Sequence, residues 1–239
     1  LMRQHASPFL SVPNAKDLLY INDLIEAGKV KPVIDRTYRM SETREALLCN
    51  GSGIYARVLM EELPLLPVED EGRLHDPVLR ENFVNRVYVY QRWQQLRETG
   101  LTPAGLIEFH TMHKYMIMAH SQAAYQRLGK LLSDLSGDRL ERTAREYALE
   151  LMTTLKRRVN RKRHVNVLQH IMGYLKRRVT PGDKQELLES MESYRRGDVP
   201  LIVPVTLLRH HFRHHPDDYI SLQWYLWPYP DGLGLRSHT

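Results

Sequence analysis

Apolar residues recur at helical spacing from about residue 100 almost to the end of the chain. Thr102 and Pro103 supply a cap and a first helical position, and later Gly and Pro residues separate the amphipathic stretches. The closing aromatic segment, LQWYLWPYPDGLGL, is expected to pack across the helices as irregular structure. The pattern predicts a mainly α protein, a helical bundle over about residues 100–235, with helices at 103–119, 121–135, 138–158, 164–178, 181–195 and 203–214.

The first part of the chain has a different pattern. Residues 14–28 form an amphipathic stretch that ends at a glycine, VKPVIDRTY reads as a short strand, and Ser41 opens a further helix. A short α/β fragment over residues 1–47 is therefore expected before the bundle. Residues 48–99 form a junction, whose second helix is expected to bury one apolar side: Val78, Leu79, Phe83, Val87 and Tyr90.

Composition excludes several classes of protein. No stretch approaches ~20 consecutive apolar residues, so no membrane span is expected, and the beginning of the chain lacks a secretory signal pattern. The one cysteine, Cys49, cannot form an internal disulfide or alone hold an iron–sulfur cluster or a structural zinc ion. A reducing, cytoplasmic setting fits best.

The charge is unevenly distributed. The net charge of +6 divides into −1 for residues 1–95 and +7 for residues 96–239. Residues 156–178 contain nine basic side chains and no acidic one. A block of one sign this long favours an anionic partner, most often a phosphate backbone, although a solvated helix face is the alternative.

Three polar clusters interrupt the apolar helices, in FHTMHKYMIMAHS, RKRHVNVLQHIMGYLKRR and LLRHHFRHHPDDY. In the last, His210 with His214 and His211 with His215 have the i, i+4 spacing of metal ligands. No cysteine accompanies them and no HExxH pattern supplies a general base, so no metal site is assigned. Contact with nucleic acid and structural roles in the bundle both remain open for these histidines.

The second part of the chain resembles a known family. From Leu101 to about Pro230 it is similar to YbgA-like proteins, through the words LIEFHTMHKYMIMAHS, YQRLGKLL, RHVNVLQHIMGYLK, DKQELLESMESYRRGDVPLIVPVTLLRHH and YLWPYP. Relatives tend to have His where this chain has Tyr229. Residues 101–230 are therefore expected to form a YbgA-like helical domain, within a domain that extends over residues 100–239.

Two further resemblances concern the segments before this domain. GIYARVLMEELPLLPVEDEGRLHDPVLRENF looks like the junction in longer relatives, the RudS-type tRNA 4-thiouridine desulfidases, where three cysteines hold an iron–sulfur cluster. Because only Cys49 is present, no cofactor is expected on this chain. DLLYINDLIEAGKVKPVIDRTYRMSETREAL resembles the C-terminal tail of medium-chain alcohol dehydrogenases and implies no dehydrogenase function, since no dinucleotide-binding motif accompanies it.

The resemblance and the charge together predict an RNA-binding module, with tRNA as the expected partner. Six cations are expected to hold phosphates: Arg157, Arg158, Arg161, Lys162, Arg163 and Lys176. A polar pocket is expected where the first cluster faces residues 164–170: His110, His113, Lys114, His164, Asn166, Gln169, His170, Tyr174 and Arg209. The alternative is a small enzyme that acts on a nucleobase or related anion, with His113 and His170 as acid and base and Lys114 or Arg209 as the anion clamp.

Overall fold

The computed structural model describes residues 59–133, 135 and 139–237, and the chain divides into two compact units, residues 1–62 and 63–239. The expected α/β fragment of residues 1–47, its resemblance to dehydrogenase tails and Cys49 all lie outside the described residues. The second unit is the part that can be compared with the sequence.

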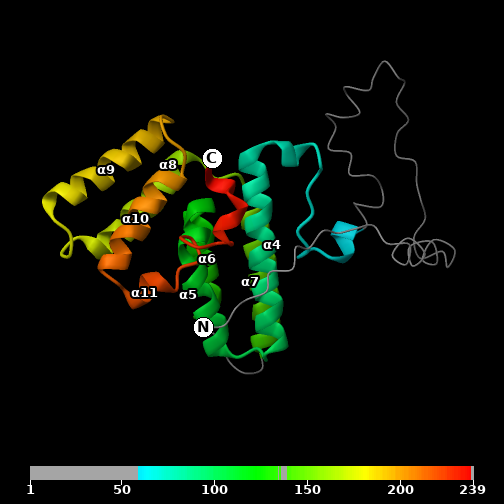
Figure 1. The fold of residues 1–239 in the computed structure, drawn as a ribbon. Coiled ribbons are helices and arrows are strands. Elements are labelled where there is room, and N and C mark those ends of the chain that lie inside the picture. Colours follow the sequence, from blue (N-terminus) through cyan, green and yellow to red (C-terminus); the bar gives the residue numbers. More distant parts are fainter. Residues whose placement is uncertain (1–58, 134, 136–138, 238–239) are drawn as a thin grey trace, which may run out of the picture. The chain divides into compact units, whose positions relative to one another are not determined.

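Every regular element in the described part of the chain is helical, which confirms the predicted mainly α fold (Figure 1). All six predicted helices of the bundle are present, with ends that differ from the predicted ones by one to several residues. The elements are α4 (Pro77–Glu98), α5 (Pro103–His120), α6 (Gln122–Leu131), α7 (Leu140–Leu155), α8 (Arg161–Met172) with the 3-10 turn η4 (Gly173–Leu175), α9 (Pro181–Arg196), α10 (Ile202–His214) and α11 (Asp218–Ser221). None of the described helices is long and apolar enough to cross a membrane.

Local signals set the helix ends. The Thr102 side chain accepts a hydrogen bond from the Gly105 N–H, and Pro103 follows at the first helical position. α9 begins with a capping box between Thr180 and Asp183. It ends at Gly197, whose φ of 95° lies in the left-handed region that favours glycine.

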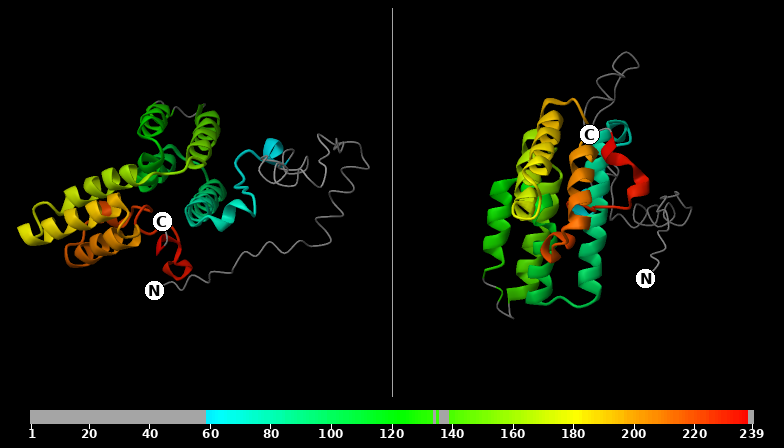
Figure 2. Two further views of the ribbon diagram at one scale, coloured as in Figure 1. Left: turned by 90° about the horizontal axis from the view of Figure 1, so that it is seen from above. Right: turned by 60° about the vertical axis from the view of Figure 1, so that its left-hand side comes forward.

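Two hydrophobic clusters form the core, and α5 contributes to both. One contains Trp93, Phe109 and Tyr147, where α4, α5, α6 and α7 pack together. The other contains Leu168 and Leu208, where α5, α8, α9, α10 and the C-terminal segment meet. Figure 2 shows the two helix groups on either side of α5. Because α5 is covered on both sides, residues 115–120 in its second half are all buried, as expected for the central helix of a bundle.

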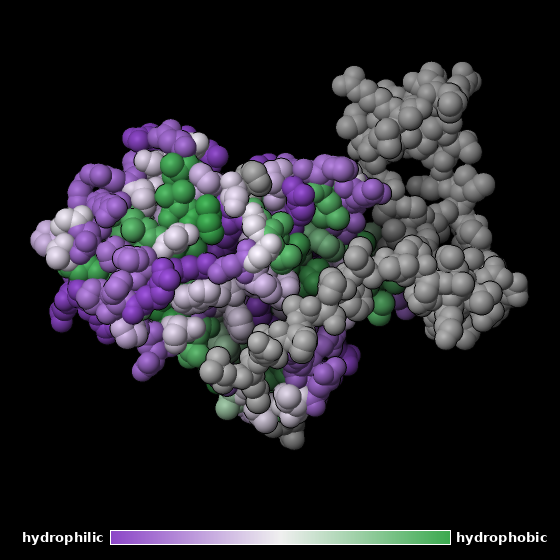
Figure 3. Space-filling model, in the orientation of Figure 1, coloured by the Kyte–Doolittle hydropathy of each residue, from purple (hydrophilic) through white to green (hydrophobic). Residues whose placement is uncertain are grey.

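The surface keeps some apolar side chains. Figure 3 shows a face on which they gather in patches, one of them over α9 and α10, where Val203 is 39% exposed. Much of the accessible surface of a folded protein comes from apolar atoms, so these side chains by themselves indicate no particular partner.

The predicted buried face of α4 is wrong. Val87 is exposed, and Val78, Leu79, Phe83 and Tyr90 are only partly buried. The helix instead buries a face that is polar in its first half: Glu81, Asn82, Asn85, Arg86, Val89 and Trp93. Polar side chains can be buried here because remote partners reach them, and these partners are not visible in the local pattern.

The C-terminal segment, residues 222–237, runs between α10 and α4 and supplies the partners of Glu81 (Figure 1), whereas Arg86 pairs with Glu69, which precedes the helix. Arg236 pairs with Glu81 at 2.9 Å, and the Arg92 guanidinium donates to the Pro228 carbonyl. The backbone N–H of Trp224 donates to the backbone carbonyl of Met112. The irregular aromatic segment therefore ties α4 and α5 together, as expected from the sequence.

Candidate nucleic-acid interface

The outer face of α8 carries several of the polar residues that the sequence singled out. Val165, Val167, Leu168 and Ile171 face the core. The remaining positions form an exposed stripe along the helix, which we call the α8 stripe: Arg161, Lys162, Asn166, Gln169, His170 and, in η4, Tyr174. Amides, an imidazole and a phenol therefore lie side by side on one exposed surface.

Basic side chains lie at both ends of the α8 stripe. Six precede the helix or occupy its first turn, and three follow it: Lys156, Arg157, Arg158, Arg161, Lys162, Arg163, Lys176, Arg177 and Arg178. All nine are exposed, and the two groups are separated by a helix about 18 Å long. The basic run thus forms two groups that the α8 stripe connects.

Almost none of this charge is neutralised within the protein. Arg178 pairs with Asp217 at 3.4 Å, and none of the other eight cations makes an ion pair among the described residues. The first turn of α8 contains no acidic side chain. Cations there are unfavourable by roughly 0.3–1 kcal/mol each because they meet the positive end of the helix dipole. An anion bound at this end would remove that cost.

An aromatic pair lies at the far end of the α8 stripe. The rings of Tyr174 and Tyr219 are stacked, with centroids 5.5 Å apart, and Tyr174 is 37% exposed. The Lys114 ammonium lies 5.6 Å from the Tyr219 ring and 5.2 Å from the Tyr115 ring. The partly exposed phenols next to a cation offer a stacking surface for an unpaired base.

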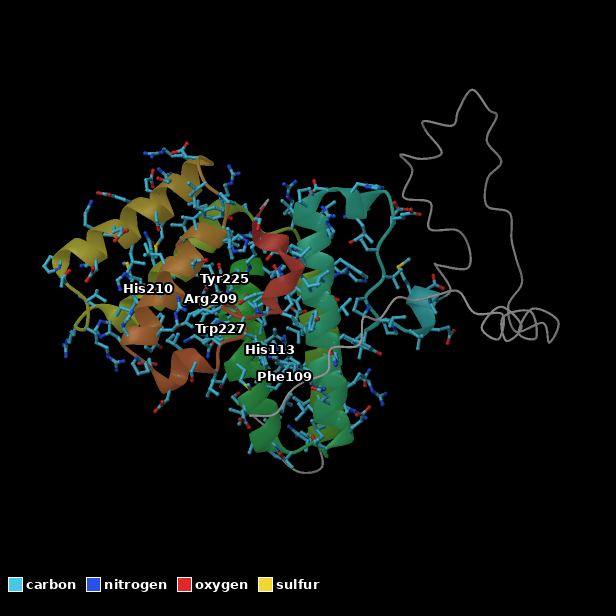
Figure 4. All side chains as sticks on the ribbon, in the orientation of Figure 1. Phe109, His113, Arg209, His210, Tyr225 and Trp227 are labelled. Atoms are coloured by element: carbon cyan, nitrogen blue, oxygen red, sulfur yellow. The ribbon has the colours of Figure 1, made fainter. Side chains whose placement is uncertain are left out.

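His110 and His113, which precede Lys114 in the first polar cluster, pack against aromatic side chains of the core. The His110 ring stacks on Tyr125, and its Nδ1 lies 3.1 Å from the Tyr147 hydroxyl. His113 is 1% exposed, and its Nδ1 lies 2.7 Å from the Phe109 carbonyl oxygen (Figure 4). Burial lowers the pKa of His110 to about 4 and that of His113 to about 3, so both rings are neutral near pH 7.

The expected single polar pocket is therefore divided. Asn166, Gln169 and His170 point to solvent because they lie on the face of α8 opposite its apolar side. Only His164 turns inward, where its Nδ1 lies 2.8 Å from the Tyr225 hydroxyl. The rings of His110 and His113 lie among aromatic side chains of the other core cluster. Helix periodicity thus separates residues that are close in sequence.

A buried polar centre that the sequence analysis did not identify surrounds His164. It joins α4, the end of α5, α8 and the C-terminal segment around a cavity of about 30 Å³: Glu81, Asn82, Asn85, His120, His164, Tyr225 and Arg236. The His120 Nδ1 lies 2.7 Å from the Arg157 carbonyl oxygen, and the Asn85 Oδ1 has no hydrogen-bond partner among the described residues. The size suits a single water-sized group, so this centre is a structural junction. Glu81, Asn82 and Asn85 recur at helical spacing, and this polar periodicity is the feature of the sequence that indicates a buried polar face on α4.

Burial controls the protonation of this centre. It lowers the pKa of His120 to about 4 and that of His164 well below the ordinary value, and the Arg236 charge adds to the effect on His164. Burial also works against the charge of Arg236, but Glu81 raises the pKa of this guanidinium above its usual value. The Glu81 carboxylate and the Arg236 guanidinium form an ion pair beside these imidazoles.

Arg209 lies apart from the other predicted pocket residues, on α10. Its Nε donates to the Leu226 carbonyl at 2.9 Å, and its Nη1 pairs with Asp231 at 2.8 Å. Its guanidinium lies 5.6 Å from the centre of the Trp227 ring. Arg209 therefore belongs to the contact between α10 and the C-terminal segment.

The histidines at the end of α10 are not arranged as a set of metal ligands. His210 and His214 have ring centroids 4.7 Å apart, whereas His211 is buried and its Nε2 finds no hydrogen-bond partner in the described part of the chain. Within residues 59–133, 135 and 139–237, no group of three His, Cys, Asp or Glu side chains is arranged to hold a metal ion.

The helical domain with this exposed basic surface has known relatives. Residues 114–230 match the family described as "Protein of unknown function (DUF1722)", and the chain belongs to this family. It is 32% identical over 152 residues to the uncharacterised protein YbgA of Escherichia coli (strain K12). The aligned region covers 63% of this chain and 90% of YbgA. The YbgA-like resemblance is thereby confirmed. No solved structure matches the chain.

Proposed function

We propose that the chain is an RNA-binding helical module and that tRNA is its ligand. The observation that carries this proposal is the exposed, largely unpaired basic surface at both ends of the α8 stripe. Phosphate contacts position a nucleic acid, and release of condensed counterions supplies much of the binding free energy.

The α8 stripe supplies groups suited to single-stranded or distorted RNA. Asn166 and Gln169 offer amides that can both donate and accept, and His170 offers an exposed ring. The stacked pair Tyr174 and Tyr219 offers a surface for an unstacked base. RNA is read through shape, backbone and exposed bases, and this combination favours RNA over regular DNA.

In longer relatives, this module would present tRNA to a 4-thiouridine desulfidase domain. This part of the proposal rests on the resemblance of the residues before the helical domain to the junction in RudS-type proteins. The chain itself has a single cysteine and would hold no iron–sulfur cluster of that kind. On this proposal it binds tRNA without removing sulfur.

The alternative small enzyme is not favoured by the geometry. His113 is enclosed by Phe109 and Trp224, whereas His170 is exposed on α8. A shared acid and base would both need to reach one substrate, and neither residue lines the cavity of the buried polar centre. The Lys114 ammonium is directed at tyrosine rings.

The experiment compares two triple variants of equal charge in a tRNA-binding assay by fluorescence anisotropy. Arg157→Ala, Arg158→Ala and Lys162→Ala together remove exposed cations whose side chains make no hydrogen bond, ion pair or ring contact within the described residues. Lys130→Ala, Arg142→Ala and Arg145→Ala together remove exposed cations from the end of α6 and from the beginning of α7, whereas residues 156–158 follow the end of α7. We expect the first variant to bind tRNA at least about tenfold more weakly and the second to bind nearly as the parent does.

Equal affinities for the two variants would contradict the proposed interface. Thermal unfolding of both variants is the control, since neither set of side chains supports the core. A parent protein that shows no saturable tRNA binding at low salt would contradict the proposed function altogether.

A further inference from the structure

A second cavity, of about 400 Å³, lies between α10 and the C-terminal segment. One side is a single stripe of α10 that includes Thr206, Arg209 and Arg213 at spacings of three and four residues. The opposite side contains Trp227 and Arg236. Pockets that hold small organic ligands typically measure about 300–1,000 Å³, so this cavity is of suitable size.

The aromatic wall of the cavity is held in place. The Arg209 guanidinium lies near the Trp227 ring (Figure 4). The Leu226 carbonyl and the Asp231 carboxylate accept hydrogen bonds from this guanidinium and hold it in place. Because Arg209 neutralises Asp231, the one acidic side chain that lines the cavity does not repel an anion. Trp227 is only partly buried, so part of the indole remains accessible.

Two further guanidinium groups have free donors. Arg236 is 4% exposed, donates from Nε to Glu81 and from Nη1 to the Tyr225 carbonyl, and makes no hydrogen bond from Nη2 within the described part of the chain. Arg213 is exposed and makes no ion pair among the described residues. A buried guanidinium with an unused N–H and an exposed guanidinium without an ion pair line the same cavity, and both are suited to the oxygens of a phosphate or carboxylate.

We propose that this cavity binds an aromatic anion of mononucleotide size, with the ring against Trp227 and the anionic group between Arg213 and Arg236. An indole face accepts any planar base, and the guanidinium groups supply directed N–H donors for oxygens. The site is built by α10 and the C-terminal segment, and it does not involve the cations of the α8 stripe.

The test measures binding of adenosine 5′-monophosphate to the whole chain by calorimetry, with adenosine and inorganic phosphate as its two halves. We expect the nucleotide to bind more tightly than either half. Arg213→Gln and Trp227→Leu should each weaken nucleotide binding by about tenfold, since a stacked base and a charged hydrogen bond each contribute on this scale.

The matched control is Arg145→Gln, which changes an equally exposed arginine on α7, outside the cavity. The fold of Arg213→Gln is expected to be intact because its side chain has no partner among the described residues. The indole N–H signals of the three tryptophans provide a second measurement. That of Trp227 should shift with nucleotide, and that of Trp93, which is 4% exposed in the other core cluster, should not.

Absence of saturable nucleotide binding would overturn the proposal, as would binding that Arg213→Gln and Trp227→Leu leave unchanged. Equal binding of inorganic phosphate and of the nucleotide would overturn the role of Trp227. Loss of tRNA binding upon substitution of Arg157, Arg158 and Lys162 with unchanged nucleotide binding would show that the two sites are independent.

Discussion

The buried ion pair between Glu81 and Arg236 should be a principal support of the fold. It joins α4 to the last described turn of the chain, and its side chains are 7% and 4% exposed. The Tyr229 hydroxyl also donates to Glu81, at 3.3 Å. The substitution Glu81→Gln keeps the shape of the side chain at position 81 but leaves the charge of Arg236 buried without a counter-ion.

Removal of one partner from a buried pair costs about 3–5 kcal/mol, which lowers the melting temperature of a domain of this size by about 6–20 °C. The combined change Glu81→Met and Arg236→Met should recover much of this loss because no isolated charge remains. Urea and thermal unfolding followed by circular dichroism would measure both effects.

The matched control is the exposed pair of Arg97 and Glu141, whose side chains are 42% and 66% exposed. Glu141→Gln should cost less than about 1 kcal/mol, as is usual for a surface ion pair. If Glu81→Gln is no more destabilising than Glu141→Gln, the account of the buried polar centre is refuted.

Four further outcomes are expected. Burial lowers the pKa of His113 to about 3 and that of His120 to about 4, so the unfolded chain binds more protons below the ordinary value of 6.5, and the free energy of unfolding should fall as pH decreases from 6.5 to 4. His113→Phe should reduce this slope in urea unfolding by up to about 1.4 kcal/mol per pH unit. Gly197→Ala should destabilise by about 1 kcal/mol or more in the same assay, because φ is 95° there and the added Cβ would meet the Arg161 guanidinium. Tyr174→Ala should weaken tRNA binding in anisotropy by about 1–3 kcal/mol, whereas Tyr90→Ala on α4 should not. The purified chain should leave the 4-thiouridine absorbance of tRNA unchanged under anaerobic conditions with iron and sulfide, and Cys49→Ser should bind tRNA as the parent does; turnover that Cys49→Ser abolishes would contradict this.

The helices of the bundle could be predicted from the sequence because their signals are local. Thr102 with Pro103 and Thr180 with Asp183 fix helix starts through groups only a few residues apart. The exposure of the basic run could also be predicted, since the apolar residues of α8 define its inner face.

The buried face of α4 could not be predicted in this way. Glu81 is buried only because Arg236 reaches it from 155 residues further along the chain. A hydrophobic pattern favours the apolar side of such a helix and carries no information about a remote partner. The same limitation explains the divided pocket, because His113 and His164 lie in different core clusters that local spacing does not distinguish.

The most direct test of the proposed function is the salt dependence of tRNA binding. The logarithm of the binding constant should fall linearly with the logarithm of the salt concentration, since each neutralised phosphate releases counterions. Arg161→Ala, Lys162→Ala and Arg163→Ala together should reduce the slope by roughly two to three. Thermal unfolding must be followed alongside, because Arg163 also donates to the His120 carbonyl. A parent slope near zero, or an unchanged slope in a folded triple variant, would contradict the assignment of this surface to RNA.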